Sequence, residues 1–293
     1  MAVLSSRAVS VDLGTAPRYS LAKTVLSHGW VNLVPFRWDE NSQVLHRIEL
    51  VGGRAYRLAM RQPAADCVKV TCSPVDRDPR GMADSALGVL EKRVVRILST
   101  DENTDALLKL SRDINPAVAE HVAQGGGRLL RGSTLFEDAV KTLFATNASW
   151  RFTQSMVISI VDAFGIGGAF PSPEELRAVT EQELRDRVRC GYRAKALIAL
   201  IQHFLSGNNE VDGVQGPLFG FGDYALSHLD VLQRRYRRIP IDSEVRAYCL
   251  ERHEFQSDGQ IIARYRQWGD FAFLGYKLER QTDGTNWIGD VRG

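Results

Sequence analysis

Alternating hydrophobic and polar positions mark the first quarter of the chain as β structure. From residue 20 to about residue 73 the pattern has a period of two, which is typical of strands with one buried face. Two such runs, Val44–Val51 and residues 54–61, are separated by Gly52-Gly53, the signal of a tight hairpin. Residues 67–72 alternate in the same way. The sequence therefore predicts a small antiparallel sheet.

After about Met82 the hydrophobic period changes to that of a helix. One apolar stripe contains Leu87, Leu90, Val94, Val95 and Leu98, the spacing of one helix face. Three later segments carry helix N-terminal signals: Thr134 with Glu137, Ser172-Pro173-Glu174-Glu175, and Thr180 with Glu183. Such signals combine a capping hydroxyl with an acidic third position. We expect roughly eight to ten helices in this region.

These patterns predict an α+β chain with a sheet first and helices after it. We expect a loose leader at residues 1–19, an antiparallel β domain at residues 20–81, a helical domain at residues 82–280 and a frayed tail at residues 281–293. The polar, proline-containing residues 73–80 are expected to form the linker.

Composition limits the classes of function without choosing one. The 293 residues are 44% hydrophobic and 25% charged, as in soluble globular proteins, which excludes a wholly disordered, collagen-like or coiled-coil chain. Lys and Arg number 37 against 35 Asp and Glu. A nucleic-acid partner would therefore need a local basic surface.

The cysteines and histidines show no metal-binding pattern. The four cysteines contain no CxxC pair and no iron–sulfur spacing, and no HExxH motif is present. Cys67 and Cys72 lie five apart, but no second pair follows, so buried thiols are the favoured interpretation over zinc. Reduced thiols, with no signal peptide and no apolar run of ~18 residues, predict a cytoplasmic protein outside the membrane.

The segment from Leu218 to Ala225 is the first candidate for chemistry. Gly220 and Gly222 are separated by one residue and precede a helical pattern. Their bare backbone amides, together with the helix N-terminus, can approach a phosphate closely. An ordinary glycine-rich turn between two helices also explains the spacing, and on spacing alone it is favoured.

Asp242 is the second candidate. It precedes a helical pattern that contains Val245, Cys249 and Leu250, so it fits the role of an N-cap. In a functional interpretation the helix dipole holds the carboxylate ionised. An ionised carboxylate can stabilise a cationic sugar and activate water.

Basic residues gather at two further places. One group contains Arg187, Arg189, Arg193 and Lys195, and the other contains Arg234, Arg235, Arg237 and Arg238 around Tyr236. Each group can face phosphates or simply solvent, and the sequence leaves both alternatives open.

Taken together, these motifs resemble the helix-hairpin-helix (HhH-GPD) superfamily of base-excision DNA glycosylases. The hairpin and Pro240-Ile241-Asp242 match its hairpin and aspartate signature. The segments 142–165 and 170–195 look like 8-oxoguanine DNA glycosylase, while Ser27-His28-Gly29-Trp30 and residues 35–38 look like bacterial 3-methyladenine DNA glycosylase II. The resemblance covers residues 20–280 and is strongest from 134 to 250.

The resemblance implies a fold and a reaction. The fold would be a small antiparallel β domain followed by a two-lobed helical domain with the active site in its cleft. The target nucleotide would flip into a pocket, where Asp242 is the catalytic carboxylate that opposes positive charge on the sugar and orients water. The partner would be double-stranded DNA with a damaged base, bound by a monomer that associates with the bacterial nucleoid.

The resemblance also implies DNA and cation contacts. Gly220 and Gly222 would donate amides to a phosphate, Asn147 would fill the gap left by the flipped base, and Arg193 and Lys195 would contact the backbone. The only cofactor expected is a monovalent cation at the hairpin, held by the carbonyls of Gly216, Leu218 and Phe221.

Two departures from the family pattern bear on the reaction and the substrate. Tyr224 stands where bifunctional members carry a lysine, and a phenol cannot form a Schiff base, so we expect a monofunctional enzyme. Positions that grip 8-oxoguanine in its own enzyme hold His228, Tyr276 and Arg280. Aromatic faces suit cationic alkylated purines such as 3-methyladenine, although Tyr224, His228 and Tyr276 can also be plain core residues.

Three interpretations remain open at this point. The first is a glycosylase for alkylated purines, and the second is a glycosylase for oxidised or deaminated purines. The third is a non-catalytic damaged-DNA-binding protein that uses the same hairpin and cleft.

Overall fold

The computed structural model describes residues 8–76, 84–207 and 218–284. Within them the elements are β1 (Val9–Gly14), α1 (Leu21–Val25), η1 (Gly29–Asn32), β2 (Arg37–Asp39), β3 (Val44–Val51), β4 (Arg54–Ala64), β5 (Cys67–Pro74), α2 (Asp84–Leu98), α3 (Asp105–Ile114), α4 (Pro116–Ala123), α5 (Leu135–Ala145), α6 (Trp150–Phe164), α7 (Glu181–Glu183), η2 (Leu184–Val188), α8 (Arg193–Leu205), α9 (Asp223–Leu232), α10 (Ser243–His253), α11 (Asp258–Tyr265), η3 (Arg266–Phe271) and α12 (Ala272–Thr282).

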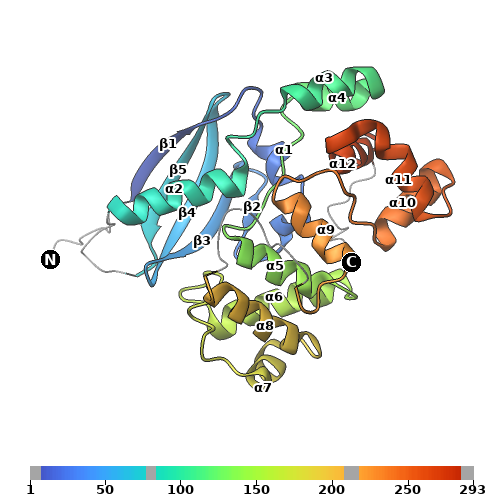
Figure 1. Cartoon of the computed structure of the whole chain (residues 1–293). Coiled ribbons are helices and arrows are strands. Elements are labelled where there is room, and N and C mark those ends of the chain that lie inside the picture. Colours follow the sequence, from blue (N-terminus) through green and yellow to red (C-terminus); the bar gives the residue numbers. More distant parts are fainter. Residues whose placement is uncertain (1–7, 77–83, 208–217, 285–293) are drawn as a thin grey trace.

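The expected antiparallel sheet is present, in the order β1-β5-β4-β3-β2 (Figure 1). β3 and β4 pair across Gly52-Gly53 as the hairpin signal predicts. The register places Met60 opposite both Leu45 and Val70, and all three are buried. One face of the sheet therefore carries an apolar row toward the helices.

The first strand corrects the expectation of a loose leader at residues 1–19. β1 pairs with β5 along its whole length, from Val9 opposite Cys72 to Gly14 opposite Cys67. Val9, Val11 and Leu13 alternate with polar residues, a strand pattern too short to stand out without its partner. The exposed edge of β5 supplies that partner, because an edge strand has unpaired backbone groups.

The described helices α2 to α12 outnumber the roughly eight to ten expected from loop lengths. One reason is that Asn115 caps α4 directly after α3, with Pro116 in the first position of the new helix. Thr180 forms the predicted capping box with Glu183. Thr134 also caps its helix.

Two of the predicted capping signals need correction. The carboxylate of Glu137 accepts from the amide of Ser133 rather than that of Thr134, so the box at α5 is only half formed. Residues 173–178 form turns instead of a helix. The carboxylate of Glu175 accepts a hydrogen bond from the amide of Ser172. In the segment that follows, some backbone amides donate to the carbonyl three residues earlier and others to the carbonyl four residues earlier, so no regular helix forms.

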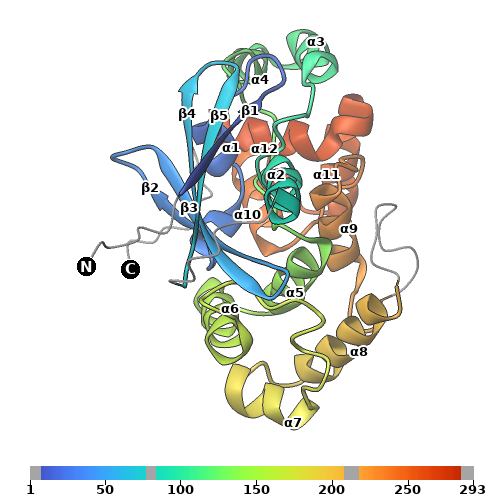
Figure 2. The same ribbon diagram turned by 90° about the vertical axis from the view of Figure 1, so that its left-hand side faces the viewer.

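The buried apolar side chains form two clusters. The first joins the sheet to α2, α5, α6 and α8, and the second joins α3 and α4 to α10, α11 and α12. The helix α9 belongs to both, since Leu229 and Leu232 lie in the first cluster and Val231 in the second. Figure 2 shows α7 and α8 at one end of the molecule and α3 and α4 at the other. The boundary expected near residue 81 stays a prediction, because residues 77–83 lie outside the described part and the sheet shares its core with helices.

A buried ion cluster fastens the sheet to α5. Arg47 of β3 and Lys141 of α5 each lie 2.6 Å from a carboxylate oxygen of Glu137, and Arg47 also pairs with Glu49. The ring of Phe36 lies beneath both cations. Although burial alone would raise it, the charges of Arg47 and Lys141 hold the pKa of Glu137 far below its ordinary value. In the described residues no helix is long and apolar enough to cross a membrane.

Candidate active site

A cavity of about 1190 Å³ opens between the two clusters, somewhat larger than an ordinary ligand pocket. Its walls come from the end of α5, the starts of α6 and α8, the hairpin with α9, the start of α10, and α12. Nine residues singled out from the sequence line it: Asn147, Arg193, Lys195, Gly220, Gly222, Tyr224, His228, Asp242 and Tyr276. The structure thus brings these residues together, while their roles stay predictions.

The two hairpin glycines have different local requirements. Gly220 has a φ of 84°, and a Cβ there would lie 2.5 Å from the Cβ of Ala196 on α8. Gly222 precedes α9 with an ordinary φ of −83°, and a Cβ there would meet no atom within 4 Å. Gly220 is therefore needed for packing, whereas Gly222 leaves its backbone open to the cavity side.

The described residues include Leu218 and Phe221 of the expected cation site. Gly216 lies outside the described residues. The carbonyl of Leu218 accepts a hydrogen bond from the amide of Phe221 at 3.0 Å and keeps a second lone pair that suits a cation. Within the described part of the chain, no group of three or more His, Cys, Asp or Glu side chains could hold a metal ion.

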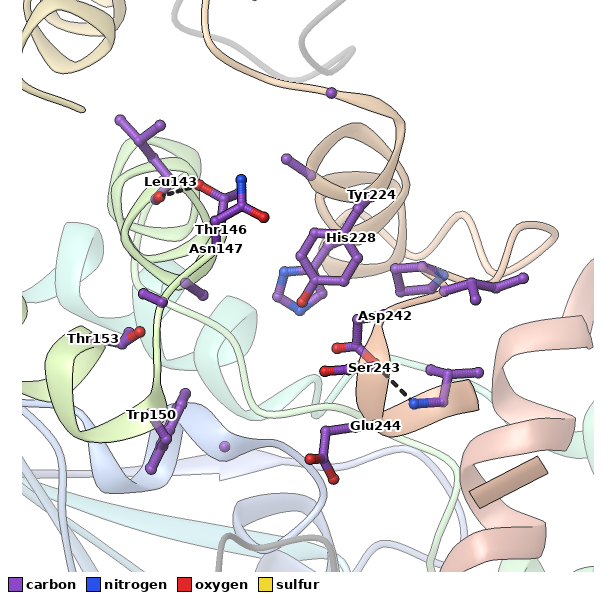
Figure 3. A pocket seen from close by; sticks show the side chains of 18 of the residues that line it. Leu143, Thr146, Asn147, Trp150, Thr153, Tyr224, His228, Asp242, Ser243 and Glu244 are labelled. Carbon is purple, nitrogen blue, oxygen red and sulfur yellow. Dashed lines mark hydrogen bonds between the residues drawn. The ribbon is translucent and has the colours of Figure 1, made fainter. Parts of the chain in front are cut away.

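Asp242 is the N-cap of α10, as its position in the sequence predicts. Its Oδ1 accepts the amide of Val245 at 2.9 Å, which fixes the carboxylate at the cavity wall (Figure 3). Burial raises the pKa of Asp242, the charge of Glu244 raises it further, and the hydrogen bond from Val245 lowers it only in part. Desolvation therefore outweighs the amide contact in the direction of the pKa shift. That the helix N-terminus holds this carboxylate ionised stays a prediction.

Tyr224 and His228 project from α9 toward Asp242 (Figure 3). Their rings lie in stacked orientation with centroids 6.0 Å apart. Burial raises the pKa of the Tyr224 phenol, and the charge of Asp242 with a hydrogen bond to it acts in the same direction. The phenol is thus held protonated beside the carboxylate.

Asn147 and Arg193 form one unit at the cavity mouth. Asn147 is exposed and adopts a φ of 48° in the turn between α5 and α6. The buried guanidinium of Arg193 donates to the carbonyls of Thr146 and Asn147. Arg193 therefore holds this turn in place, a contact that sequence analysis did not predict. Its phosphate contact stays a prediction.

The remaining basic residues divide into two kinds. Lys195 is exposed, and its amine lies 5.3 Å from the ring centroid of Phe219 in the hairpin. In the downstream cluster, Arg234 pairs with Asp101 and Glu102, while Arg235 and Arg238 pair with Asp230. These partners are carboxylates of the chain itself, which favours a structural role for this second group.

Neither a protein-family model nor a curated protein sequence matches the chain. Solved structures do match. A 3-methyladenine DNA glycosylase from Archaeoglobus fulgidus superposes with a TM-score of 0.67 at 14% identity, covering 94% of this chain and 98% of its own. The 8-oxoguanine glycosylase/lyase of Clostridium acetobutylicum gives a TM-score of 0.64 at 15% identity, covering 92% and 94% of the two chains.

A complex of that Clostridium enzyme with double-stranded DNA, in which cytosine lies opposite 8-oxoguanine, gives a TM-score of 0.63 at 12% identity and covers 94% and 98%. The chain has the fold of these DNA glycosylases. The expected α+β architecture, a sheet followed by helices, is confirmed.

Three aromatic residues, His28, Trp30 and His228, lie together in the cavity lining. The sequence pointed to them only through the family resemblance. His28 and His228 share a hydrogen bond of 3.1 Å between their Nε2 atoms, and His228 Nδ1 lies 3.1 Å from the hydroxyl of Thr142. The ring of Trp30 lies within 5.2 Å of both imidazoles. Burial lowers the pKa of His228 to about 4 and lowers that of His28 well below its ordinary value, so both imidazoles are neutral near pH 7.

The helix α12 supplies a group that sequence analysis missed. Tyr276 accepts a hydrogen bond from Arg280 at 3.1 Å, and Lys277 lines the same cavity. Burial lowers the pKa of Lys277 to about 7, with a further contribution from Arg280 and an opposing one from Asp242. The signal in the sequence is a lysine set among Phe273, Leu274, Tyr276 and Leu278, all of them buried.

Proposed function

We propose that this protein is a base-excision DNA glycosylase. It binds double-stranded DNA, flips a damaged purine into the cavity and hydrolyses the N-glycosidic bond. The observation that carries the proposal is the position of Asp242 beside the glycine hairpin, Asn147 and an aromatic cavity, within a fold shared with known DNA glycosylases.

Asp242 is the proposed catalytic residue. As the bond between C1′ and the base nitrogen breaks, its electron pair leaves with the base and positive charge develops on the sugar. A fixed carboxylate stabilises that charge, and the same carboxylate orients the water whose oxygen bonds to C1′. The Val245 amide fixes the carboxylate before the substrate arrives.

The hairpin and the turn after α5 form the proposed DNA-binding edge. The open backbone at Gly222 and the exposed amine of Lys195 suit phosphate contacts, which position the duplex without reading its sequence. Asn147, presented by the Arg193-braced turn, is placed to occupy the gap that the flipped nucleotide leaves. A flipped nucleotide needs such support because unstacking it costs a few kcal/mol.

The enzyme is proposed to be monofunctional. Tyr224 occupies the hairpin position that needs an amine for a lyase step, and its phenol instead faces Asp242. Borohydride treatment of the reaction should therefore trap no covalent complex with damaged DNA. A trapped complex would contradict this proposal, and its loss in Lys195→Ala or Lys277→Ala would identify the nucleophile.

Alkylated purines are the proposed substrates. Trp30, Tyr224 and two neutral imidazoles offer π-faces to the base, and such faces attract the positive charge of a methylated purine. One observation favours a second candidate, a neutral purine that carries an exocyclic carbonyl group. Lys277 adds a side chain with a nitrogen donor to the residues that line the cavity.

The test is a panel of duplexes that each carry one lesion: 3-methyladenine, 7-methylguanine, hypoxanthine or 8-oxoguanine. Base release and abasic sites are measured with the wild type and with Asp242→Asn. Release of a damaged purine that is lost in the variant supports the proposal. Binding of damaged duplexes with no release of any base would instead favour a non-catalytic DNA-binding protein.

A further inference from the structure

The hydrolysis mechanism uses Asp242 and gives no role to Lys277, a buried basic residue of the cavity. Lys277 lies on α12, is only 5% exposed and lines the cavity. Its neighbours on the same helix, Tyr276 and Arg280, are joined by a hydrogen bond. Its charge interacts with those of Asp242 and His228, which line the same cavity.

Opposing electrostatic effects act on the pKa of Lys277. Removal from water disfavours the ammonium form, the guanidinium of Arg280 disfavours it further, and the carboxylate of Asp242 favours it. The resulting pKa of about 7 means that the cavity gains or loses one positive charge close to neutral pH.

The groups that face Lys277 from other elements do not change charge in the same range. His28, beside η1, and His228, on α9, both interact electrostatically with Lys277, and the pKa of each imidazole is lowered well out of the neutral range. The pKa of Tyr276 is raised to about 12 by burial. The other charged side chains that line the cavity are Arg193, Lys195, Asp242, Glu244, Arg246 and Arg280.

We propose that Lys277 sets the balance between the two proposed substrate classes: its amine donates to an exocyclic carbonyl oxygen of a neutral purine, and its charged form slows the release of a cationic alkylated purine. This inference rests on the proposed base-excision function and deepens it. Lys277 acts here as a specificity-determining residue, with Asp242 unchanged as the catalytic group.

Two physical effects act in the same direction. An amine that donates to a carbonyl oxygen of the base adds a hydrogen bond that a base without this acceptor cannot accept. An ammonium group also repels a positively charged base strongly in a cavity of low dielectric constant. The neutral amine above pH 7 exerts no such repulsion, so cationic bases become better substrates as the pH rises.

The experiment compares two substrates under single-turnover conditions at about pH 7. One is a duplex with a single hypoxanthine, which carries a carbonyl group and no charge. The other is a dimethyl-sulfate-treated duplex, from which released 3-methyladenine is measured by chromatography. The proteins are the wild type, Lys277→Met, which has neither charge nor donor, and Lys277→Gln, which keeps a donor without charge.

We expect Lys277→Met to raise the ratio of 3-methyladenine release to hypoxanthine release by about tenfold or more. Lys277→Gln should also relieve the repulsion, yet retain more hypoxanthine release than the Met variant. In the wild type the ratio should rise between about pH 6 and pH 8.5, but not in Lys277→Met. The ratio of the two release rates within one protein cancels the ionisation of Asp242, because this residue acts on both substrates.

Lys109→Met is the matched control, because Lys109 is exposed on α3 and does not line the cavity; its ratio should equal that of the wild type. Base release with the same ratio in wild type, Lys277→Met and Lys277→Gln would overturn the inference alone. A covalent complex trapped by borohydride and lost in Lys277→Met would also overturn it, since the amine would then be a nucleophile. Release of another damaged purine of the panel but of neither of these two bases would overturn this inference alone. Release of no damaged purine at all would overturn the proposed function and this inference together.

Discussion

Lys141 and Lys277 are both buried lysines, yet they serve different parts of the molecule. Lys141 lies 2.6 Å from Glu137 in the ion cluster between the sheet and α5, and it does not line the cavity. Lys277 lines the cavity, and after burial the strongest influence on it is repulsion by Arg280. Burial of a charge therefore does not by itself indicate function. The arrangement of neighbouring charges and an adjoining cavity separate the two cases.

The largest expected effect lies in the ion cluster. Glu137→Gln removes the carboxylate that Arg47 and Lys141 share, so the free energy of unfolding should fall by about 3–5 kcal/mol. Denaturant unfolding measures this change, and Glu181→Gln is the control, because it breaks an exposed pair with Arg185 worth at most about 1 kcal/mol.

The same carboxylate predicts a pH dependence of stability. The pKa of Glu137 is depressed in the folded protein, so its stabilisation is present above the ordinary carboxyl pKa of about 4.3 and is lost as the pH falls below it. The wild type should lose its advantage over Glu137→Gln in acid. A constant difference between pH 3 and pH 7 would contradict the ion-cluster argument.

At the cavity, Asp242→Asn should lower base release by roughly a hundredfold or more, since it removes the charge that opposes the cationic sugar. Asparagine is also a good N-cap, so thermal unfolding should change little and DNA binding should persist. Asp105→Asn, an exposed change on α3, is the control. Near-normal release by Asp242→Asn would reduce this residue to a capping role.

Glu137→Gln should lower the free energy of unfolding, whereas Lys277→Met should raise it, by at least about 1 kcal/mol. Between pH 7 and about 10.4 the unfolded chain binds a proton that folded Lys277 has lost, so the wild type gains stability as the pH rises. The variant should lack this rise. Unfolding midpoints of both proteins, measured between pH 7 and about 10.4, test this prediction. A lower midpoint in Lys277→Met would show that the buried amine does not destabilise the fold.

The smallest effect is expected at the hairpin. Gly222→Val should weaken binding to all duplexes alike, by about tenfold, because a side chain there stands before a backbone amide rather than a base. The fold should tolerate it, since the space is open, whereas Gly220→Ala should lower the unfolding midpoint. Affinity should also fall with salt, with a slope of roughly −0.9 per neutralised phosphate. Salt-independent affinity would contradict docking through phosphates.

The parts of the fold that could be predicted are those with strong local signals. Gly52-Gly53 located the hairpin, and Thr180 with Glu183 located a helix start. β1 escaped notice because a strand of six residues at an edge depends on its partner β5. The predicted helix start at Ser172 was wrong for a local reason. The carboxylate of Glu175 accepts the amide of Ser172 within a turn.

The site residues also fall into those that local motifs predict and those that only the folded chain brings to the cavity. Asp242, Gly220 and Gly222 lie in contiguous motifs, so the sequence alone could single them out. Lys277 could not be placed in this manner, because α12, α9 and the start of α10 come together around the cavity only in the folded chain. His28 also lines the cavity, and its hydrogen bond to His228, two hundred positions away in the sequence, could not be predicted from either motif.

The double membership of α9 has a thermodynamic consequence. This helix carries Tyr224 and His228 into the cavity, while Leu229 and Val231 anchor it in the two apolar clusters. Neither half of the core can melt without releasing a helix that the other half requires. A molecule held in the cavity therefore stabilises the whole chain by mass action, so occupancy should raise one shared melting transition rather than that of a single lobe.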